Sequence, residues 1–335
     1  MTPRTPSPRG RRATILDVAA AAGVSRQTVT RAMNDMAGIS AGTRERVQKL
    51  AAEMGYSPSR FAKGLVQGAR ISVGLAIPDL TNPYFPAFAS SVVEAATERG
   101  WNVVVDDYGH GTGSAADAAA RLAPQVDALI GYLVPHPDEA QALMGRRPVV
   151  ALDSPDADTA GGISFDYHHA ARLALSHLVS RGCRSIVFLD SDQGGPSGSR
   201  SAAAAAVAAE AGIHLVRSQA HPSAAAAASA VAVHMAGEDR PDGILAFNDL
   251  MAAGALKALQ ESGISVPADC AVIGMDGIPL GELVTPELTT LSLDLRAVGR
   301  AAVGLLDGLL TGTIQDRSPE AHLTLRHQLI LRQSA

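Results

Sequence analysis

The sequence predicts a small all-α headpiece with a helix-turn-helix, followed by an α/β core of two lobes with parallel, doubly wound sheets. Residues 13–57 hold three short stretches with apolar residues at helical spacing. From residue 71 onward, apolar runs of strand length alternate with helix-like segments, which is typical of parallel sheets. Net charge also differs between the headpiece region and the rest of the chain. Residues 1–70 carry twelve Lys and Arg against four Asp and Glu, a net +8, and the remainder of this −5 chain is −13.

The headpiece residues predict three helices in order. Thr14 with Asp17 three residues later is a capping-box-like start for a first helix, which Gly23 ends. Ser25 can cap a second helix, and a third begins near Ser40 and continues to a glycine stop at residue 55. Their apolar faces can close one small core.

The second helix has side chains suited to reading DNA. In a helix-turn-helix this helix enters the major groove, where arginine pairs with guanine and glutamine with adenine. Arg26, Gln27 and Arg31 lie on its predicted outer face. An ordinary three-helix bundle with a polar face is the alternative interpretation. A basic head on an acidic body favours DNA, because only the head would meet phosphate.

Length and composition limit the remaining possibilities. A chain of 335 residues with 47% apolar content can bury the cores of two or three domains. Cys183 and Cys270 argue against a disulfide framework and suit a reducing cytoplasm, although one pairing stays open. Residues 1–12 lack the apolar centre of a signal peptide, so we expect a disordered basic arm, or an inert tail. Because no apolar span of membrane length follows, we expect a cytoplasmic protein without membrane contact.

A linker and a long α/β region follow the headpiece. Pro58 disfavours a helical residue before it, and residues 58–70 form a hinge whose short helix would be marginal alone in water. Residues 71–335 form the core, in which the alanine runs 202–206 and 224–228 are expected to be helical. The expected strands are 71–77, 101–105, 128–132, 148–152, 185–189, 243–247 and 270–274, and the expected helices are 87–99, 115–122, 170–180, 201–211 and 250–262.

At two places the sequence resembles a known family. The run TILDVAAAAGVSRQTVTRAMN, followed by ISAGTRERVQKLAAEMGYSPSRFAKGL, closely resembles the headpiece and hinge of LacI/GalR-family transcriptional regulators. The segments IPDLTNPYF, LAFNDLMAAGALKALQESGISVPADCAVIGMDG and TPELTTLSLDLRAVGRAA resemble the effector-binding core of that family, which is similar to type I periplasmic sugar-binding proteins. The resemblance implies a first lobe of about 71–165 and 295–322, with a ligand held between the lobes.

The resemblance also implies which residues contact DNA. The hinge would become helical on the operator, where Leu65 would insert into the minor groove with Ala62 one turn earlier. The alternative is that Leu65 packs onto the core. The expected DNA-binding residues are Thr14, Ile15, Ser25, Arg26, Gln27, Thr30, Arg31, Asn34, Ser40, Thr43, Tyr56, Ala62 and Leu65.

The expected effector site combines chemistry with resemblance. A neutral polyol buried between lobes needs donors, acceptors and an apolar platform. Arg200, Asn248 and Asp276 match the family's effector-contacting residues, and Asp153 is a weaker fourth. The alternatives are a ligand-free salt bridge between the lobes and, for Asn248, a helix cap. Further candidates in the first strand-to-helix loop are Tyr84 and Phe85, which would offer the ligand an aromatic ring.

The chain departs from the family pattern close to this site. Ala203 and Ala204 stand where relatives usually carry a glycine and an aromatic residue after the arginine. The region around His221 and Pro222 is alanine-rich where relatives often offer an aromatic platform. The sequence therefore leaves the identity of the effector open, with a sugar or sugar derivative expected.

These observations predict a sequence-specific repressor controlled by a small effector, not an enzyme. Gly109–Gly113 lacks the Lys-Ser/Thr of a P-loop, Ser197 is in no GxSxG elbow, and His168–His169 lack metal-ligand spacing, so neither cofactor nor metal is expected. The expected partners are pseudo-palindromic double-stranded operator DNA and a second copy of the chain. No leucine heptads follow the last strand-like run, which favours a dimer over a tetramer. A solute receptor and a sugar-modifying enzyme remain the alternatives.

Overall fold

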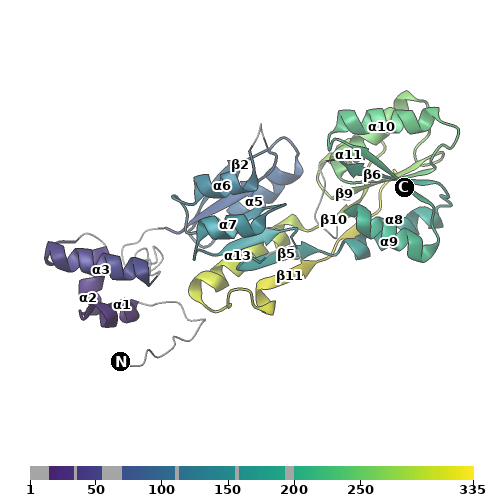
Figure 1. The fold of residues 1–335 in the computed structure, drawn as a ribbon. Coiled ribbons are helices and arrows are strands. Elements are labelled where there is room, and N and C mark those ends of the chain that lie inside the picture. The colour runs from purple at the N-terminus through teal and green to yellow at the C-terminus, as the bar shows by residue number, and fades with distance from the viewer. Residues whose placement is uncertain (1–14, 34–35, 55–69, 110–112, 155–157, 193–199) are drawn as a thin grey trace. The chain divides into compact units, whose positions relative to one another are not determined.

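The computed structural model describes residues 15–33, 36–54, 70–109, 113–154, 158–192 and 200–335 (Figure 1). The chain divides into two compact units, Met1–Arg70 and Ile71–Ala335. The described residues of the first unit form three helices, and those of the second form two α/β lobes, each built on a six-stranded sheet. The predicted arm at 1–12 and residues 58–69 of the predicted hinge lie outside the described residues, so both stay predictions.

The three headpiece helices lie where the sequence predicts them. The second and third helices are capped by serines: the Ser25 hydroxyl accepts a bond from the Thr28 amide at 3.2 Å, and the Ser40 hydroxyl accepts one from the Thr43 amide at 3.2 Å. Gly23 has a φ of +63°, which allows the tight turn that a residue with a side chain would resist. The helices are α1 (Ile15–Ala22), α2 (Arg26–Met33) and α3 (Ala41–Glu53).

A small apolar core holds the headpiece helices together. Val18, Val29 and Val47, one from each helix, are fully buried in it. The side chain of Gln48 donates to the Ala32 carbonyl at 3.0 Å, which ties α3 to α2 beside the core. Packing of the inner face of α2 against this core therefore determines which of its side chains face outward.

The first lobe of the core is an all-parallel sheet between helices. Its strand order is β11-β5-β4-β3-β1-β2. Helices α5 and α13 pack together, as do α6 and α7 (Figure 1). The strands are β1 (Ser72–Ile77), β2 (Asn102–Asp107), β3 (Ala128–Tyr132), β4 (Val149–Leu152), β5 (Gly161–Phe165) and β11 (His322–Leu325). The helices are α5 (Tyr84–Thr97), α6 (Ala115–Leu122), α7 (Pro137–Met144) and α13 (Leu295–Thr311), with a 3-10 turn at Pro319–Ala321.

The second lobe repeats this plan with one antiparallel edge strand. Its order is β12-β10-β9-β8-β6-β7, and β12 is the antiparallel member. Helices α8 and α9 lie on one side of the sheet and α10 and α11 on the other (Figure 1). The strands are β6 (Ile186–Ser191), β7 (Leu215–Ala220), β8 (Gly243–Ala246), β9 (Ala271–Asp276), β10 (Thr289–Ser292) and β12 (Gln328–Ile330). The helices are α8 (Tyr167–Ser180), α9 (Arg200–Ala211), α10 (Ala224–Ala236), α11 (Asp249–Glu261) and α12 (Leu280–Leu283).

The chain passes between the lobes three times. It crosses at Asp166, again at 293–294 before α13, and finally at 326–327 between β11 and β12. The first and last crossovers are joined, because the Asp166 amide donates to the Leu325 carbonyl at 2.9 Å and Arg326 pairs with the Asp166 carboxylate at 3.1 Å. We refer to this pair of bonded crossovers as the joint between the lobes.

The predicted fold class is confirmed, including the helical alanine runs in α9 and α10. One local prediction was wrong: Tyr84 and Phe85 form the first turn of α5, not the preceding loop. Pro83 has a φ already suited to a helix start, and the Asn82 side chain accepts a bond from the Tyr84 amide at 3.1 Å. None of the described helices is both long enough and apolar enough to cross a membrane.

Candidate functional site

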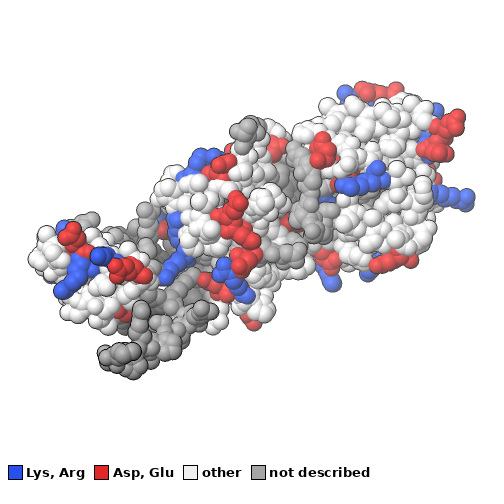
Figure 2. Space-filling view, viewed as in Figure 1, with Lys and Arg blue, Asp and Glu red and all other residues white. Residues whose placement is uncertain are grey.

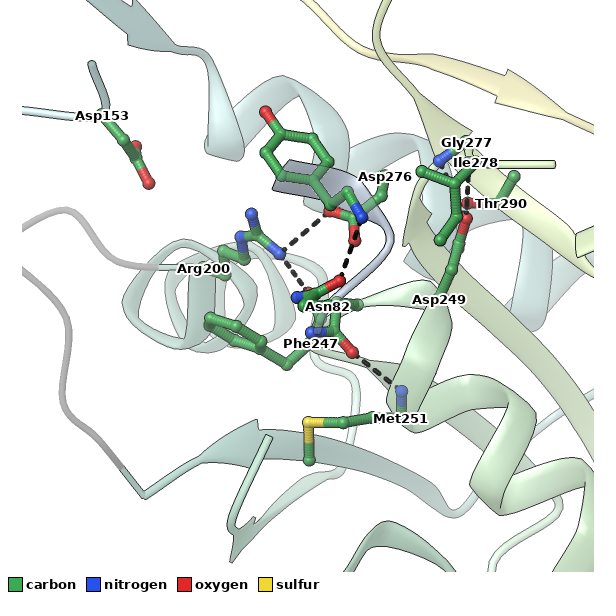
Figure 3. Close-up of polar contacts among 12 residues, drawn as sticks. Asn82, Asp153, Arg200, Phe247, Asp249, Met251, Asp276, Gly277, Ile278 and Thr290 are labelled. Atoms are coloured by element: carbon green, nitrogen blue, oxygen red, sulfur yellow. Dashed lines mark hydrogen bonds and ion pairs between the residues drawn. The ribbon is translucent and has the colours of Figure 1, made fainter. Parts of the chain in front are cut away.

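Arg200 is the centre of a polar cluster at the carboxyl ends of the core strands. It is the first residue of α9, and its side chain is 14% exposed. One guanidinium nitrogen lies 3.6 Å from the Asp276 carboxylate at the end of β9, and the same nitrogen donates to the Phe247 carbonyl after β8. Asp153, after β4 of the first lobe, flanks Arg200 on the side away from Asp276 (Figure 3). Residues of both lobes therefore meet at one cation.

Two aromatic rings hold the Arg200 guanidinium in place. Its central carbon lies 4.4 Å from the ring centre of Phe247 and 5.4 Å from that of Tyr167. Both contacts are cation–π interactions, which gain strength where water is excluded. Arg200 Nε also lies 3.4 Å from the Tyr167 hydroxyl. The guanidinium is thus oriented before any ligand contacts it.

The two carboxyl groups beside Arg200 have raised pKa values and strained backbone conformations. Burial raises the pKa of Asp276 well above its ordinary value, while Arg200 acts in the opposite direction. Burial likewise raises the pKa of Asp153, opposed by Arg200 and by a 2.7 Å hydrogen bond from the Tyr167 hydroxyl. Asp276 has a φ of 138° and Asp153 a φ of 56°, conformations that non-glycine residues adopt at a cost. Such strain at two facing strand ends indicates a functional site.

One acceptor in the cluster is not used by the protein. Asp276 is 3% exposed, and its Oδ2 has no hydrogen-bond partner among the described residues. A buried carboxylate oxygen without a donor is unfavourable, so a donor from a bound molecule would stabilise it. The site thus offers acceptors on Asp153 and Asp276 and donors on Arg200, a set that suits the hydroxyl groups of a sugar.

An aromatic wall stands beside the cluster on the first lobe. The ring centres of Tyr84 and Phe85 are 5.3 Å apart, and Phe85 lies 5.3 Å from Tyr132 at the end of β3. The hydroxyls of Tyr84 and Tyr132 are hydrogen-bonded to each other, and burial raises the pKa of both, so they stay neutral. Phe85 is half-buried and packs against the hydrophobic core, and its contact with a ligand stays a prediction.

Two neighbouring residues support the site from α11. Asn248 caps the helix, its side-chain oxygen accepting from the Met251 amide at 2.8 Å, so the cap interpretation is confirmed and a ligand contact stays a prediction. Asp249 is fully buried and accepts bonds from the amides of Gly277 and Ile278 at 2.9 and 3.0 Å. It thereby fixes the turn that directly follows Asp276 (Figure 3).

The structure brings together the predicted Arg200, Asp276 and Asp153 and places Tyr84 near them. Four further residues of this cluster, which the sequence did not predict, are Tyr132, Tyr167, Phe247 and Asp249. Each of these four either ends a strand or lies within three residues after one. Because ligands bind at the carboxyl ends of parallel strands, every polar or aromatic residue at those positions was a candidate. No group of three or more His, Cys, Asp or Glu in the described part of the chain is placed to hold a metal ion.

The headpiece presents its predicted DNA-contacting side chains to solvent. Ser25, Arg26, Gln27, Thr30 and Arg31 are all exposed on or just before α2. In the third-helix region Ser40 is exposed and Thr43 half-buried, while Ile15 packs against the headpiece core. On the core, charged side chains of both signs are interspersed on the face shown in Figure 2. The predicted contacts Thr14, Asn34, Tyr56, Ala62 and Leu65 lie outside the described residues.

Comparison with known proteins accounts for both units. A model of bacterial regulatory proteins of the lacI family matches residues 14–59, and a model of a periplasmic binding protein-like domain matches residues 175–335. The lactose operon repressor of Escherichia coli is 33% identical over 314 residues, covering 89% of this chain and 85% of that protein. The chain belongs to the LacI family. It is a DNA-binding transcriptional regulator by that membership.

Solved LacI-family structures extend the likeness. A LacI-family regulator from Arthrobacter sp. FB24, in complex with lactose, is 56% identical, with a TM-score of 0.77 over 79% of this chain and 99% of that one. The Lac repressor dimer bound to operator and the anti-inducer ONPF is 27% identical, with a TM-score of 0.71 over 97% of this chain and 99% of that one.

Proposed function

We propose that this LacI-family chain is a repressor whose operator affinity is set by a neutral sugar bound at Arg200, between the two lobes of the core. The observation that carries the proposal is the buried Asp276 carboxylate, which has one oxygen near Arg200 and the other without a donor among the residues that the structure describes. A sugar hydroxyl can donate to that oxygen, while a ring oxygen or a second hydroxyl accepts from Arg200. One cation between two carboxylates suits a neutral ligand better than an anionic one.

We further propose that the sugar is a disaccharide of the lactose class. The Arthrobacter regulator, solved with lactose, shares 56% identity across nearly all of its own length. The aromatic wall of Tyr84, Phe85 and Tyr132 supports this choice, because the apolar face of a sugar ring packs well against aromatic rings.

On DNA, we propose a cytoplasmic homodimer that binds a pseudo-palindromic double-stranded operator. Helix-turn-helix dimers place two recognition helices about one helical turn apart, which matches a two-fold symmetric site. The exposed Arg26, Gln27 and Arg31 would contact base edges and phosphates. No chemical step is proposed in the cleft, because ligand binding and release are sufficient for the regulation.

The test is a fluorescence-anisotropy titration of the purified protein against the DNA upstream of its own coding region. Salt is held fixed, and lactose, cellobiose, galactose, glucose, ribose and adenosine are added in turn. We expect tight binding that lactose changes by about 5- to 150-fold, the usual range of allosteric coupling, with monosaccharides acting weakly. Specific operator binding that no sugar alters would contradict the effector proposal, and product formation from any sugar would contradict the non-enzymatic one.

A further inference from the structure

We propose that Tyr167 is the positioning residue that couples a sugar at Arg200 to the joint between the lobes. This inference rests on the proposed function, since it concerns how ligand binding at the same site is coupled to the lobes. Tyr167 lies outside the predicted set of effector contacts. Its hydroxyl ties the second lobe to the first, and its ring supports the ligand-facing arginine.

Tyr167 lies at the joint between the lobes. It is the first residue of α8, directly after the crossover at Asp166. That crossover is fixed to the last one by the bond from the Asp166 amide to Leu325 and by the ion pair between Asp166 and Arg326. The backbone of Tyr167 is therefore anchored at the joint, and its side chain extends from there to the cleft.

The Tyr167 side chain contacts residues of both lobes. Its hydroxyl donates to Asp153 Oδ2 of the first lobe at 2.7 Å and lies 3.4 Å from Arg200 Nε of the second. Its ring packs 5.7 Å from the ring of His327, which lies on the last crossover. One side chain thus touches both lobes, two crossovers and the central cation of the site.

The chemistry of the hydroxyl explains why a ligand would disturb it. A phenol has one proton to donate, and here Asp153 accepts it. A sugar hydroxyl that donates to Asp153 competes with Tyr167 for that acceptor, and a sugar oxygen that accepts from Arg200 changes the cation that contacts the Tyr167 hydroxyl. Because Asp153 and Tyr167 belong to different lobes, the change must alter the force between the lobes. Burial keeps this bond strong, since Tyr167 is only 7% exposed.

The test is Tyr167→Phe, which removes the hydroxyl and keeps the ring against Arg200 and His327. The quantity measured is the ratio of operator dissociation constants with saturating lactose and without it. A residue that only helps to bind sugar would weaken lactose binding yet leave this ratio unchanged at saturation. We expect lactose affinity to fall by about 10-fold and the saturated ratio to fall below about 3-fold.

Two further variants keep the test decisive. Tyr108→Phe is the matched control, because it removes a hydroxyl that donates to the Tyr132 carbonyl inside the first lobe, and it should keep the wild-type ratio. Asp153→Ala cuts the same bridge from the other lobe and should lower the saturated ratio as Tyr167→Phe does; this variant decides the matter if Tyr167→Phe does not fold. A wild-type ratio in either bridge variant would overturn the inference while the repressor proposal stands. A wild-type protein that responds to no sugar would overturn both.

Discussion

Arg26 and Arg200 each open a helix, one in the headpiece and one in the core, and their surroundings differ in almost every physical respect. A cation at a helix N-terminus is unfavourable for the helix by about 0.3 to 1 kcal/mol, so both positions indicate a role other than stability. Arg26 is exposed at the start of α2. Arg200 is 14% exposed, contacts two rings and a carbonyl, and lies near two carboxylates.

These surroundings determine what each arginine can recognise. An exposed guanidinium is free to adapt to base edges and phosphates, and it acts on whatever approaches it. A guanidinium fixed by rings and carboxylates recognises only a molecule that fits its preset direction. The headpiece should therefore respond strongly to salt, whereas the cleft should respond strongly to the loss of a single side chain.

Salt should separate the two sites most widely. A dimer that neutralises about six phosphates loses about 10³-fold in operator affinity between about 50 and 200 mM salt, because condensed counterions are released on binding. Lactose is neutral and its proposed partners are buried, so its affinity should change by less than about twofold over the same range. Anisotropy for DNA and calorimetry for lactose measure the two slopes. Similar slopes would contradict the contrast between the sites.

Arg200→Ala should abolish the lactose response and spare operator binding. The change removes the central donor and leaves Asp276 and Asp153 buried without their cation, so we expect lactose affinity to fall by about 100-fold or more. Arg217→Ala is the matched control, because Arg217 pairs with Asp190 on β6 through an exposed guanidinium. Calorimetry and anisotropy report the two affinities. A normal lactose response in the Arg200 variant would mean that the site is misplaced.

Arg26→Ala should relax discrimination between operator sequences by about 1 to 3 kcal/mol, the usual contribution of a bidentate contact to a base. Lys49→Ala, an exposed change on α3, is the control and should weaken binding evenly across sequences. Competition among operators with single base-pair changes measures the effect. If base preference is the same in both variants, Arg26 contacts only the backbone or no DNA at all.

The sequence predicts the contrast between the sites only in part. Apolar periodicity predicts the three headpiece helices, the core helices α5, α6, α8, α9 and α11, and the strands β1, β2, β3, β4, β6, β8 and β9, because burial of one face decides each of them. It does not predict α7, α13, β5, β7 or β10: β7 has no buried residue, and β5 and β10 are short strands inside their sheets, whereas the last strand-like run covers β11 and β12. In the cleft, Arg200 and Asp276 follow from a resemblance, whereas Tyr167 and Asp249 do not. Their roles depend on contacts with Asp153 and Gly277, 14 and 28 residues away in the chain.

The smallest expected effect concerns the stability cost of the cleft. Burial raises the pKa of Asp276, so its carboxyl group binds a proton more tightly in the folded chain than in the unfolded chain. An unfolded aspartate titrates at about 3.9. Between that value and the raised pKa, the free energy of unfolding contributed by Asp276 falls as pH rises. The Asp276→Asn variant lacks this titration. Its melting temperature relative to wild type should therefore increase from acid toward neutral pH, by about 2 to 4 °C if the difference is about 1 kcal/mol.

Calorimetry of the core transition between about pH 4.5 and 7.5 measures this difference. Asp307→Asn is the control, because it makes the same chemical change at a side chain that is 45% exposed. The Asp276 variant should also lose lactose affinity, which would show that the same carboxylate lowers stability and serves binding. A melting difference that stays constant with pH would mean that Asp276 remains ionised throughout, held so by Arg200. In that case the strained, buried carboxylate would act as a fixed partner of the arginine, and the lactose response alone would report its role.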